Sequence, residues 1–195
     1  MDRKEIKIVE RPSSVSWEEI SAVLKESHLE NVNKGINLPY PALPPNEIYA
    51  KTEGSGGIML VALDGEKVVG TSAVIIIDKD LWCGSGKYAY CCFASVLPEY
   101  RGTGIYRQFS EWREKYARKM GVDRLMYDTD ERNVRVISVT KENGFRPVEY
   151  RVREGRNSVV FVKWLKKCPY SKLNCEFHFL GIKYLKKIIS SMKNN

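Results

Sequence analysis

Residues 96–109 read Val-Leu-Pro-Glu-Tyr-Arg-Gly-Thr-Gly-Ile-Tyr-Arg-Gln-Phe, and this stretch predicts a strand, a tight turn and a helix in succession. Residues 88–97 are aromatic, β-branched or small and apolar, which is the composition of a strand buried on both faces. Pro98 ends that strand because it cannot donate a hydrogen bond to a sheet. Apolar side chains then recur at helical spacing from 106 to 120, and Gly121 stands where a helix ends.

The turn between this strand and this helix has the features of a phosphate-binding site. Gly102 and Gly104 permit tight backbone geometry and let a ligand approach main-chain N–H groups. The first N–H groups of a helix lie at the positive end of its dipole, and here Arg101 and Arg107 flank them. The arrangement predicts a pyrophosphate site, although a glycine-rich turn before a helix also occurs without any ligand.

The stretch resembles motif A of the GNAT N-acetyltransferase superfamily. In that motif an apolar strand runs into Val-x-Pro and then into Arg/Gln-x-x-Gly-x-Gly/Ala at the start of a helix. Val96, Pro98, Arg101 and Gly104 match the pattern. Tyr106 departs from it, because the family has Gly or Ala at that position.

A second motif of the same family, Asn-x-x-Ala-x-x-x-Tyr-x-x-x-Gly-Phe, is in register with Asn133, Val136, Thr140, Gly144 and Phe145. The resemblance covers about residues 55–165. It implies an α/β (α+β) fold of the GNAT type. Such a fold has a central mixed, mostly antiparallel sheet of about seven strands, splayed at the fourth and fifth strands, with helices on both faces.

Local signals place the other elements. Ser16 and Glu19 form a capping-box pattern that starts a helix, and Asp64-Gly65 marks a hairpin turn between two apolar runs. Residues 31–46 contain four prolines and predict a loop, which either selects the acceptor, as the resemblance implies, or only connects two elements. Further strands are expected at 6–10, 58–63, 68–77, 124–129, from 145 onward and at 159–165, and a helix at 133–143.

The charge is concentrated at the C-terminal end. Residues 166–195 contain seven lysines and one glutamate, a net +6 of the formal +8 of the 195-residue chain. We expect a single GNAT-like domain at 1–165 and an extra C-terminal amphipathic helix in 166–195. Packing on the domain or a homodimer contact is favoured for this helix over contact with a membrane surface. The nearly neutral remainder does not indicate a nucleic-acid partner.

Composition predicts a cytoplasmic globular protein. The chain is 43% apolar and 29% charged, it has no apolar run of transmembrane length, and its first residues lack the apolar region of a signal peptide. Five cysteines, an odd number, indicate reduced thiols rather than a disulfide framework. Cys168, Cys175 and His178 lack a fourth metal ligand, so no metal site is expected.

The resemblance implies where acyl-CoA lies. Acetyl-CoA, as the acyl donor substrate, occupies the wedge between the splayed strands. Ser95, Val96 and Leu97 hold its pantetheine and offer an N–H to the thioester oxygen. The pyrophosphate is held by Arg101, Gly102, Thr103, Gly104, Ile105 and Tyr106. Asn133 orients the cofactor arm or caps the helix that begins there.

The catalytic groups are harder to assign. Thr140 stands where the family often has a general-acid tyrosine, so the thiolate leaves unprotonated or receives its proton from water, Tyr127 or Tyr150. Asp128 and Asp130 are candidates for the general base, although Asp130 also suits a helix cap.

Two further residues bear on these roles. Glu131 fits the first turn of the helix at 133–143, where it interacts favourably with the dipole. His28 is expected on the acceptor-side helix, in an exposed polar role.

Two functions remain open. The first is an acyl-CoA-dependent N-acyltransferase that transfers acetyl directly to a primary amine of a small molecule. The second is a non-catalytic acyl-CoA-binding or interaction module on the same fold, which the missing tyrosine and the presence of Tyr106 favour. The intact glycine turn and Asn133 favour the enzyme.

Overall fold

The computed structural model describes residues 6–36, 42–78, 86–153 and 156–166. Its strands are β1 (Lys7–Glu10), β2 (Ile58–Asp64), β3 (Lys67–Asp78), β4 (Lys87–Val96), β5 (Arg124–Asp130), β6 (Arg146–Arg153) and β7 (Arg156–Trp164). Its α-helices are α1 (Trp17–Asn33), α2 (Pro45–Lys51), α3 (Ile105–Lys119) and α4 (Val134–Glu142).

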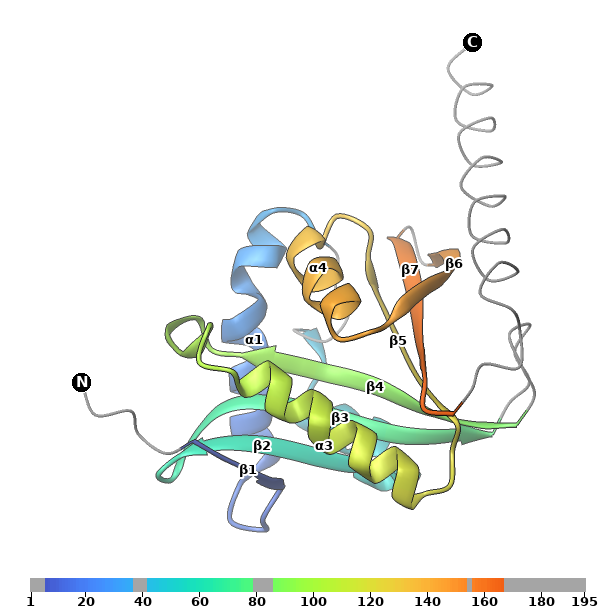
Figure 1. Cartoon of the computed structure of the whole chain (residues 1–195). Coiled ribbons are helices and arrows are strands. Elements are labelled where there is room, and N and C mark those ends of the chain that lie inside the picture. The colour runs from blue at the N-terminus through green and yellow to red at the C-terminus, as the bar shows by residue number, and fades with distance from the viewer. Residues whose placement is uncertain (1–5, 37–41, 79–85, 154–155, 167–195) are drawn as a thin grey trace.

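The strands form one seven-stranded sheet in the order β1-β2-β3-β4-β5-β7-β6. The pair β4–β5 is parallel and the other neighbours are antiparallel, which confirms the predicted mixed sheet. β4 and β5 pair only at Ala89 with Leu125 and at Tyr90 with Met126, so the strands diverge beyond these residues. Figure 1 shows α3 in front of the sheet and α1 behind it, as predicted for helices on both faces.

The predicted local signals produce the expected elements. The Ser16 side chain accepts from the Glu19 backbone N–H while the Glu19 carboxylate accepts from the Ser16 N–H, which confirms the capping box. The turn at Asp64-Gly65 joins β2 to β3 as the predicted hairpin. The main hydrophobic core contains Leu24 of α1 and Phe109 of α3. Packing in this core holds both helices against β3 and β4.

Two predictions about connectivity need correction. The proline-rich segment 31–46 is not one loop, because α1 continues to Asn33 and the adjacent Pro44 and Pro45 begin the short helix α2. Proline is well accommodated at the start of a helix, where an N–H would lack an intrahelical partner. The strand predicted at 159–165 was also expected, as the last in the sequence, to close the sheet, and the corresponding strand β7 does not do so. It lies between β5 and β6, which leaves β6 at the edge.

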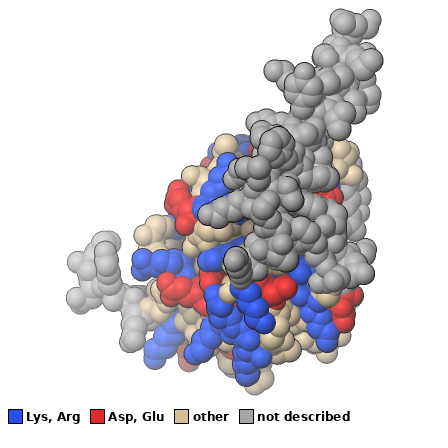
Figure 2. Space-filling model, turned by 45° about the vertical axis from the view of Figure 1, so that its right-hand side comes forward, with Lys and Arg blue, Asp and Glu red and all other residues tan. Residues whose placement is uncertain are grey.

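Some expectations concern residues beyond the described part. The predicted C-terminal helix lies there, as do Cys168, Cys175 and His178. Cys91 and Cys92 are free and buried, as expected for reduced thiols. No helix within the described ranges is long and apolar enough to cross a bilayer. Figure 2 shows basic and acidic side chains interspersed on the face that it presents.

Candidate active site

A β-bulge turns the second half of β4 away from β5. Phe93 has φ of 51°, in the left-handed region that a phenylalanine seldom adopts, and the register with β3 shifts at this point. The Thr71 hydroxyl of β3 donates to the Phe93 carbonyl at 2.8 Å and lies 2.9 Å from the Ser95 hydroxyl. These contacts hold the bulge in place, so the wedge between β4 and β5 stays open.

The end of β4 presents one main-chain donor to the wedge. The Leu97 N–H donates to the Val69 carbonyl at 3.0 Å, toward β3. Because successive N–H groups of a strand point to opposite edges, the Val96 N–H points to the wedge. The predicted role of donor to the thioester oxygen therefore fits Val96 and does not fit Leu97, whose N–H is already bonded and whose side chain is buried in the core.

The turn after β4 has the predicted open backbone. Gly102 and Gly104 have φ of 81° and 89°, and a Cβ at either position would meet no atom within 4 Å. Gly104 is the N-cap of α3 and supplies no side-chain cap, so the first N–H groups of α3 are not capped by a side chain. The hydroxyl of Thr103 donates to the Tyr100 carbonyl at 2.6 Å and fixes the shape of the turn.

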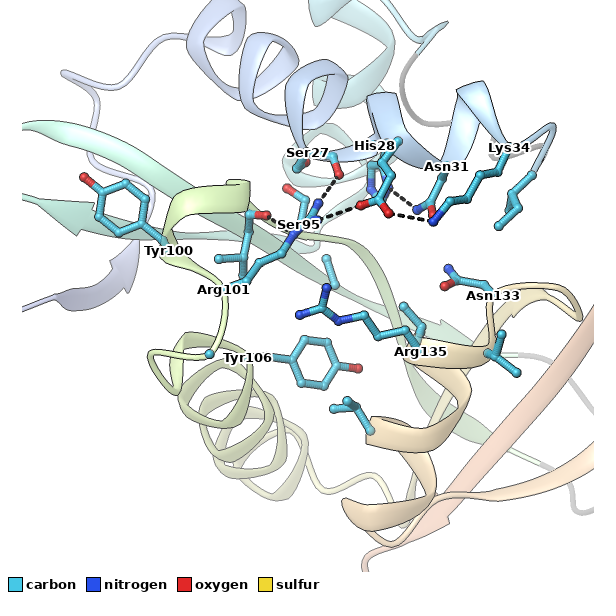
Figure 3. A pocket seen from close by; sticks show the side chains of 18 of the residues that line it. Ser27, His28, Asn31, Lys34, Ser95, Tyr100, Arg101, Tyr106, Asn133 and Arg135 are labelled. Atoms are coloured by element: carbon cyan, nitrogen blue, oxygen red, sulfur yellow. Dashed lines mark hydrogen bonds and ion pairs between the residues drawn. The ribbon is translucent and has the colours of Figure 1, made fainter.

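A cavity of about 550 Å³ lies where the wedge, this turn, α1 and α4 meet (Figure 3). Three of the predicted cofactor-binding residues do not line it, namely Leu97, Thr103 and Ile105. The other seven do, namely Ser95, Val96, Arg101, Gly102, Gly104, Tyr106 and Asn133. Residues from both sequence motifs, far apart in the chain, therefore meet around one space.

The two arginines predicted beside the phosphate turn have other roles. Arg101 points to α1, where it donates to the Ser27 carbonyl at 2.7 Å and to the Glu30 carboxylate at 3.1 Å. It fastens the turn to α1. The Arg107 side chain is 77% exposed, lies 3.8 Å from Glu111 and does not line the cavity.

Arg135, which was not among the predicted site residues, places a cation in the cavity. It comes from the first turn of α4, and its guanidinium extends across the cavity toward the β4–α3 turn (Figure 3). Within the described ranges it forms no hydrogen bond or ion pair, so its charge is available to a ligand. The sequence signal was weak, because this position lies between the defining residues of the second motif.

Asn133 faces the cavity and does not cap α4. It occupies the N-cap position, yet its side chain makes no cap hydrogen bond. Its Nδ2 donates instead to the Thr129 hydroxyl at 3.3 Å, and the residue is buried at the cavity wall. Of the two roles expected from the sequence, this geometry is compatible with contact to a bound ligand.

Neither aspartate proposed as the general base lines the cavity. Asp130 is completely buried, and its carboxylate accepts from Nε and Nη2 of Arg132 at 2.9 and 2.8 Å and from the Arg132 N–H at 2.9 Å. It stabilises the turn before α4. Asp128 accepts a hydrogen bond from the Tyr90 hydroxyl across the wedge, just beyond the last paired residues. A role as base stays a prediction, and Asp128 has the more suitable position.

His28 is buried, contrary to the exposed role expected for it. It is 9% exposed and lines the cavity, because α1 turns this face toward the end of β4. Its Nδ1 lies 3.4 Å from Nδ2 of Asn31, while Nε2 is buried without a hydrogen-bond partner. Burial, and secondarily the charge of Arg101, lowers the pKa of His28 to about 4, so the imidazole is neutral at neutral pH.

The alternative proton donors also lie away from the cavity. The Tyr127 hydroxyl is hydrogen-bonded to the Thr140 hydroxyl, and burial raises the pKa of Tyr127. Tyr150 lies on β6 beside a second, smaller pocket, and burial raises its pKa as well. Two tyrosines line the main cavity instead, Tyr106 and Tyr100, and the Tyr100 hydroxyl is directed to the Asp64 carboxylate, to which it donates at 2.8 Å.

Comparison with known proteins identifies the fold. The model of the acetyltransferase (GNAT) family matches residues 17–145. A GNAT acetyltransferase structure from Staphylococcus aureus has 19% identity to this chain and a TM-score of 0.66. The alignment covers 83% of this chain and 100% of the Staphylococcus aureus chain. YncA from Salmonella typhimurium, solved with its cofactor acetyl-CoA, has 14% identity, coverage of 85% and 96%, and a TM-score of 0.62.

A plant protein gives a similar match. NAA60 from Arabidopsis thaliana, solved in complex with a bisubstrate analogue, has 19% identity, coverage of 81% and 98%, and a TM-score of 0.59. No curated protein matches the sequence. At such identities these solved structures establish the shared fold.

Proposed function

Because the chain belongs to the GNAT acetyltransferase family, we propose that it transfers the acetyl group of acetyl-CoA directly to a primary amine of a small molecule. The observation that carries this proposal is the cavity in which the open end of the β4–β5 wedge meets the glycine turn. A thioester and a pyrophosphate are the two parts of acyl-CoA that such a site would need to hold.

Acetyl-CoA is the acyl donor that this family uses. In this chain Gly102 and Gly104 leave room for the pyrophosphate beside the first N–H groups of α3, where the helix dipole favours an anion. Arg135 adds a cation on the opposite wall. Ser95 and Val96 line the same space where β4 ends, and suit the pantetheine arm.

The reaction joins the amine nitrogen to the thioester carbonyl carbon and then breaks the carbon–sulfur bond. The Val96 N–H, which points into the wedge, would stabilise the negative charge that develops on the carbonyl oxygen. The attacking amine must lose a proton. Asp128 lies at the wedge beside Tyr90 and is the candidate that we retain for this step.

The alternative is a module that binds acyl-CoA without catalysing transfer. Thr140 in place of the family tyrosine and the large side chain of Tyr106 in the cavity support this alternative. Binding of acetyl-CoA is common to both functions, so turnover of an amine separates them.

Calorimetry with acetyl-CoA tests the donor site. We expect saturable micromolar binding by the wild type and affinity about tenfold weaker for Arg135→Gln, which loses a charge-assisted contact. Arg107→Gln is the matched control. Arg107 is an arginine of α3, and its side chain is exposed outside the cavity. Gly104→Trp should abolish binding by filling the turn. Failure of the wild type to bind at millimolar acetyl-CoA would refute the acetyltransferase proposal.

Turnover is then measured as the release of free CoA thiol with a panel of amino sugars, amino acids, polyamines and peptides with a free N-terminus. We expect one class of primary amine to give saturable turnover. Binding without turnover for every amine would favour the non-catalytic module.

A further inference from the structure

Helix α3 carries a buried arginine that has no acidic partner among the described residues. Arg113 of α3 is 4% exposed, and its Nε donates to the Phe109 carbonyl at 3.2 Å. No carboxylate forms an ion pair with it in the part of the chain that the structure describes. A guanidinium remains charged in a protein, and a buried charge without a counter-ion is costly. Its presence here therefore calls for a functional explanation.

Tyr106 stands between this guanidinium and the cavity. The two residues lie on the same face of α3, two turns apart, and the Arg113 guanidinium lies over the Tyr106 ring. Cζ of Arg113 is 5.3 Å from the centre of the Tyr106 ring. Figure 3 shows the ring lying across the space between α3 and α4, with its hydroxyl directed toward α4. Tyr106 lines the cavity and Arg113 does not.

The second departure from the family motifs, Thr140 of α4, faces β5. Its hydroxyl is hydrogen-bonded to the Tyr127 hydroxyl of β5. The two departures from the family motifs, a tyrosine at 106 and a threonine at 140, therefore come from the two helices, α3 and α4, that flank the same space (Figure 3). A tyrosine hydroxyl is present between α3 and α4, but it is supplied by α3.

We propose that Tyr106 is the general acid that protonates the leaving thiolate of CoA, and that Arg113 is the positioning residue that stabilises the resulting phenolate. The proposal rests on the acetyl transfer proposed above. As the tetrahedral intermediate collapses, the carbon–sulfur bond breaks and the sulfur takes the phenolic proton. The phenolate remains beside the guanidinium and recovers a proton from solvent through the cavity.

The chemistry suits the pair. A free phenol has a pKa of roughly 10 and a free thiol of roughly 8.5, so proton transfer between them is only modestly uphill. The Arg113 guanidinium, 5.3 Å from the centre of the ring, faces the negative charge that forms on the phenolate. A general acid contributes roughly 100- to 10,000-fold to the rate of a reaction of this kind.

The first test does not need the acceptor. CoA itself is bound to the wild type and to Tyr106→Phe, and its thiol is titrated by the ultraviolet absorbance of the thiolate, with the desulfo-CoA complex as the baseline. We expect the bound thiol of the phenylalanine variant to ionise at least one pH unit higher, because the thiolate loses a hydrogen-bond donor. Tyr116→Phe, a change on the same helix outside the cavity, should behave as the wild type.

Kinetics with the best amine give the second test. Tyr106→Phe should lower kcat at least 100-fold with little change in KM for acetyl-CoA, and should lose the basic limb of the pH profile. Arg113→Met should shift that limb to higher pH, and Arg113→Lys should restore it partly, which a purely structural role would not produce. Calorimetry of acetyl-CoA binding shows that each variant is folded.

The possible failures can be told apart. If the wild type binds no CoA, the proposed function falls and this proposal falls with it. If CoA binds but the thiol titrates identically in wild type and Tyr106→Phe, acetyl transfer stands and the role of Tyr106 is refuted. A Tyr106→Phe enzyme with full kcat would refute it equally.

Discussion

The burial of His28 predicts a specific dependence of stability on pH. The pKa of His28 is about 4 in the folded chain and 6.5 in an unfolded one. Between these values the unfolded chain binds more protons, so stability is retained above about pH 6.5 and is lost as the pH falls toward 4. At pH 5 the unfolded chain is nearly fully protonated at this residue, and the folded chain is protonated to roughly a tenth.

The size of the effect follows from the two pKa values. Lowering the pH from about 7 to about 5 should reduce the free energy of unfolding by about 2 kcal/mol through His28 alone. The measurement is urea denaturation at both pH values, followed by tryptophan fluorescence. Carboxylates titrate at low pH as well, so the useful quantity is the difference between wild type and His28→Asn.

Two variants make this test specific. His28→Asn should lose about 2 kcal/mol less than the wild type between the two pH values. Arg101→Gln should reduce the pH dependence by a smaller amount, because the charge of Arg101 is the second cause of the lowered pKa. If wild type and His28→Asn lose the same stability, His28 is not a buried neutral group and this reasoning is wrong.

Three further substitutions test other parts of the fold. Ser16→Ala should cost about 1 kcal/mol in urea denaturation, because the capping box of α1 is lost; an unchanged midpoint would contradict this. Thr71→Val should cost about 1–2 kcal/mol by removing the hydroxyl that donates to the Phe93 carbonyl, and an equal stability of both proteins would show that the bulge needs no such support. Gly104→Ala should cost about 1 kcal/mol through its positive φ and should weaken acetyl-CoA binding in calorimetry, whereas unchanged stability would show that the turn relaxes.

The parts of the fold that depend on local signals were predictable. The succession from β4 through the glycine turn into α3 needs only an apolar run, Pro98 and two glycines. The capping box at Ser16 and the Asp64-Gly65 hairpin are also fixed by neighbours in the sequence. In each case the interacting groups lie within a few residues, so spacing alone specifies the geometry.

The direction in which side chains point was not predictable. Arg101 and Arg135 both lie within the two family motifs. Arg101 donates hydrogen bonds to Ser27 and Glu30 only because α1 packs against the turn that carries it. His28 is buried for the same reason, because the position of α1 depends on contacts with β3 and β4. These are long-range interactions, which periodicity cannot reveal.

The departures from the family motifs acquire a meaning only in three dimensions. In the sequence, Tyr106 suggests an obstructed phosphate turn and Thr140 suggests a missing acid, and each alone argues against catalysis. In the structure the Tyr106 ring lies between α3 and α4, while the turn at Gly102 and Gly104 stays open. Because the Tyr127 hydroxyl satisfies Thr140, no buried hydroxyl is left without a partner there. In the catalytic role proposed above, the tyrosine hydroxyl that the family often supplies from α4 is supplied here from α3, where Arg113 lies over the same ring.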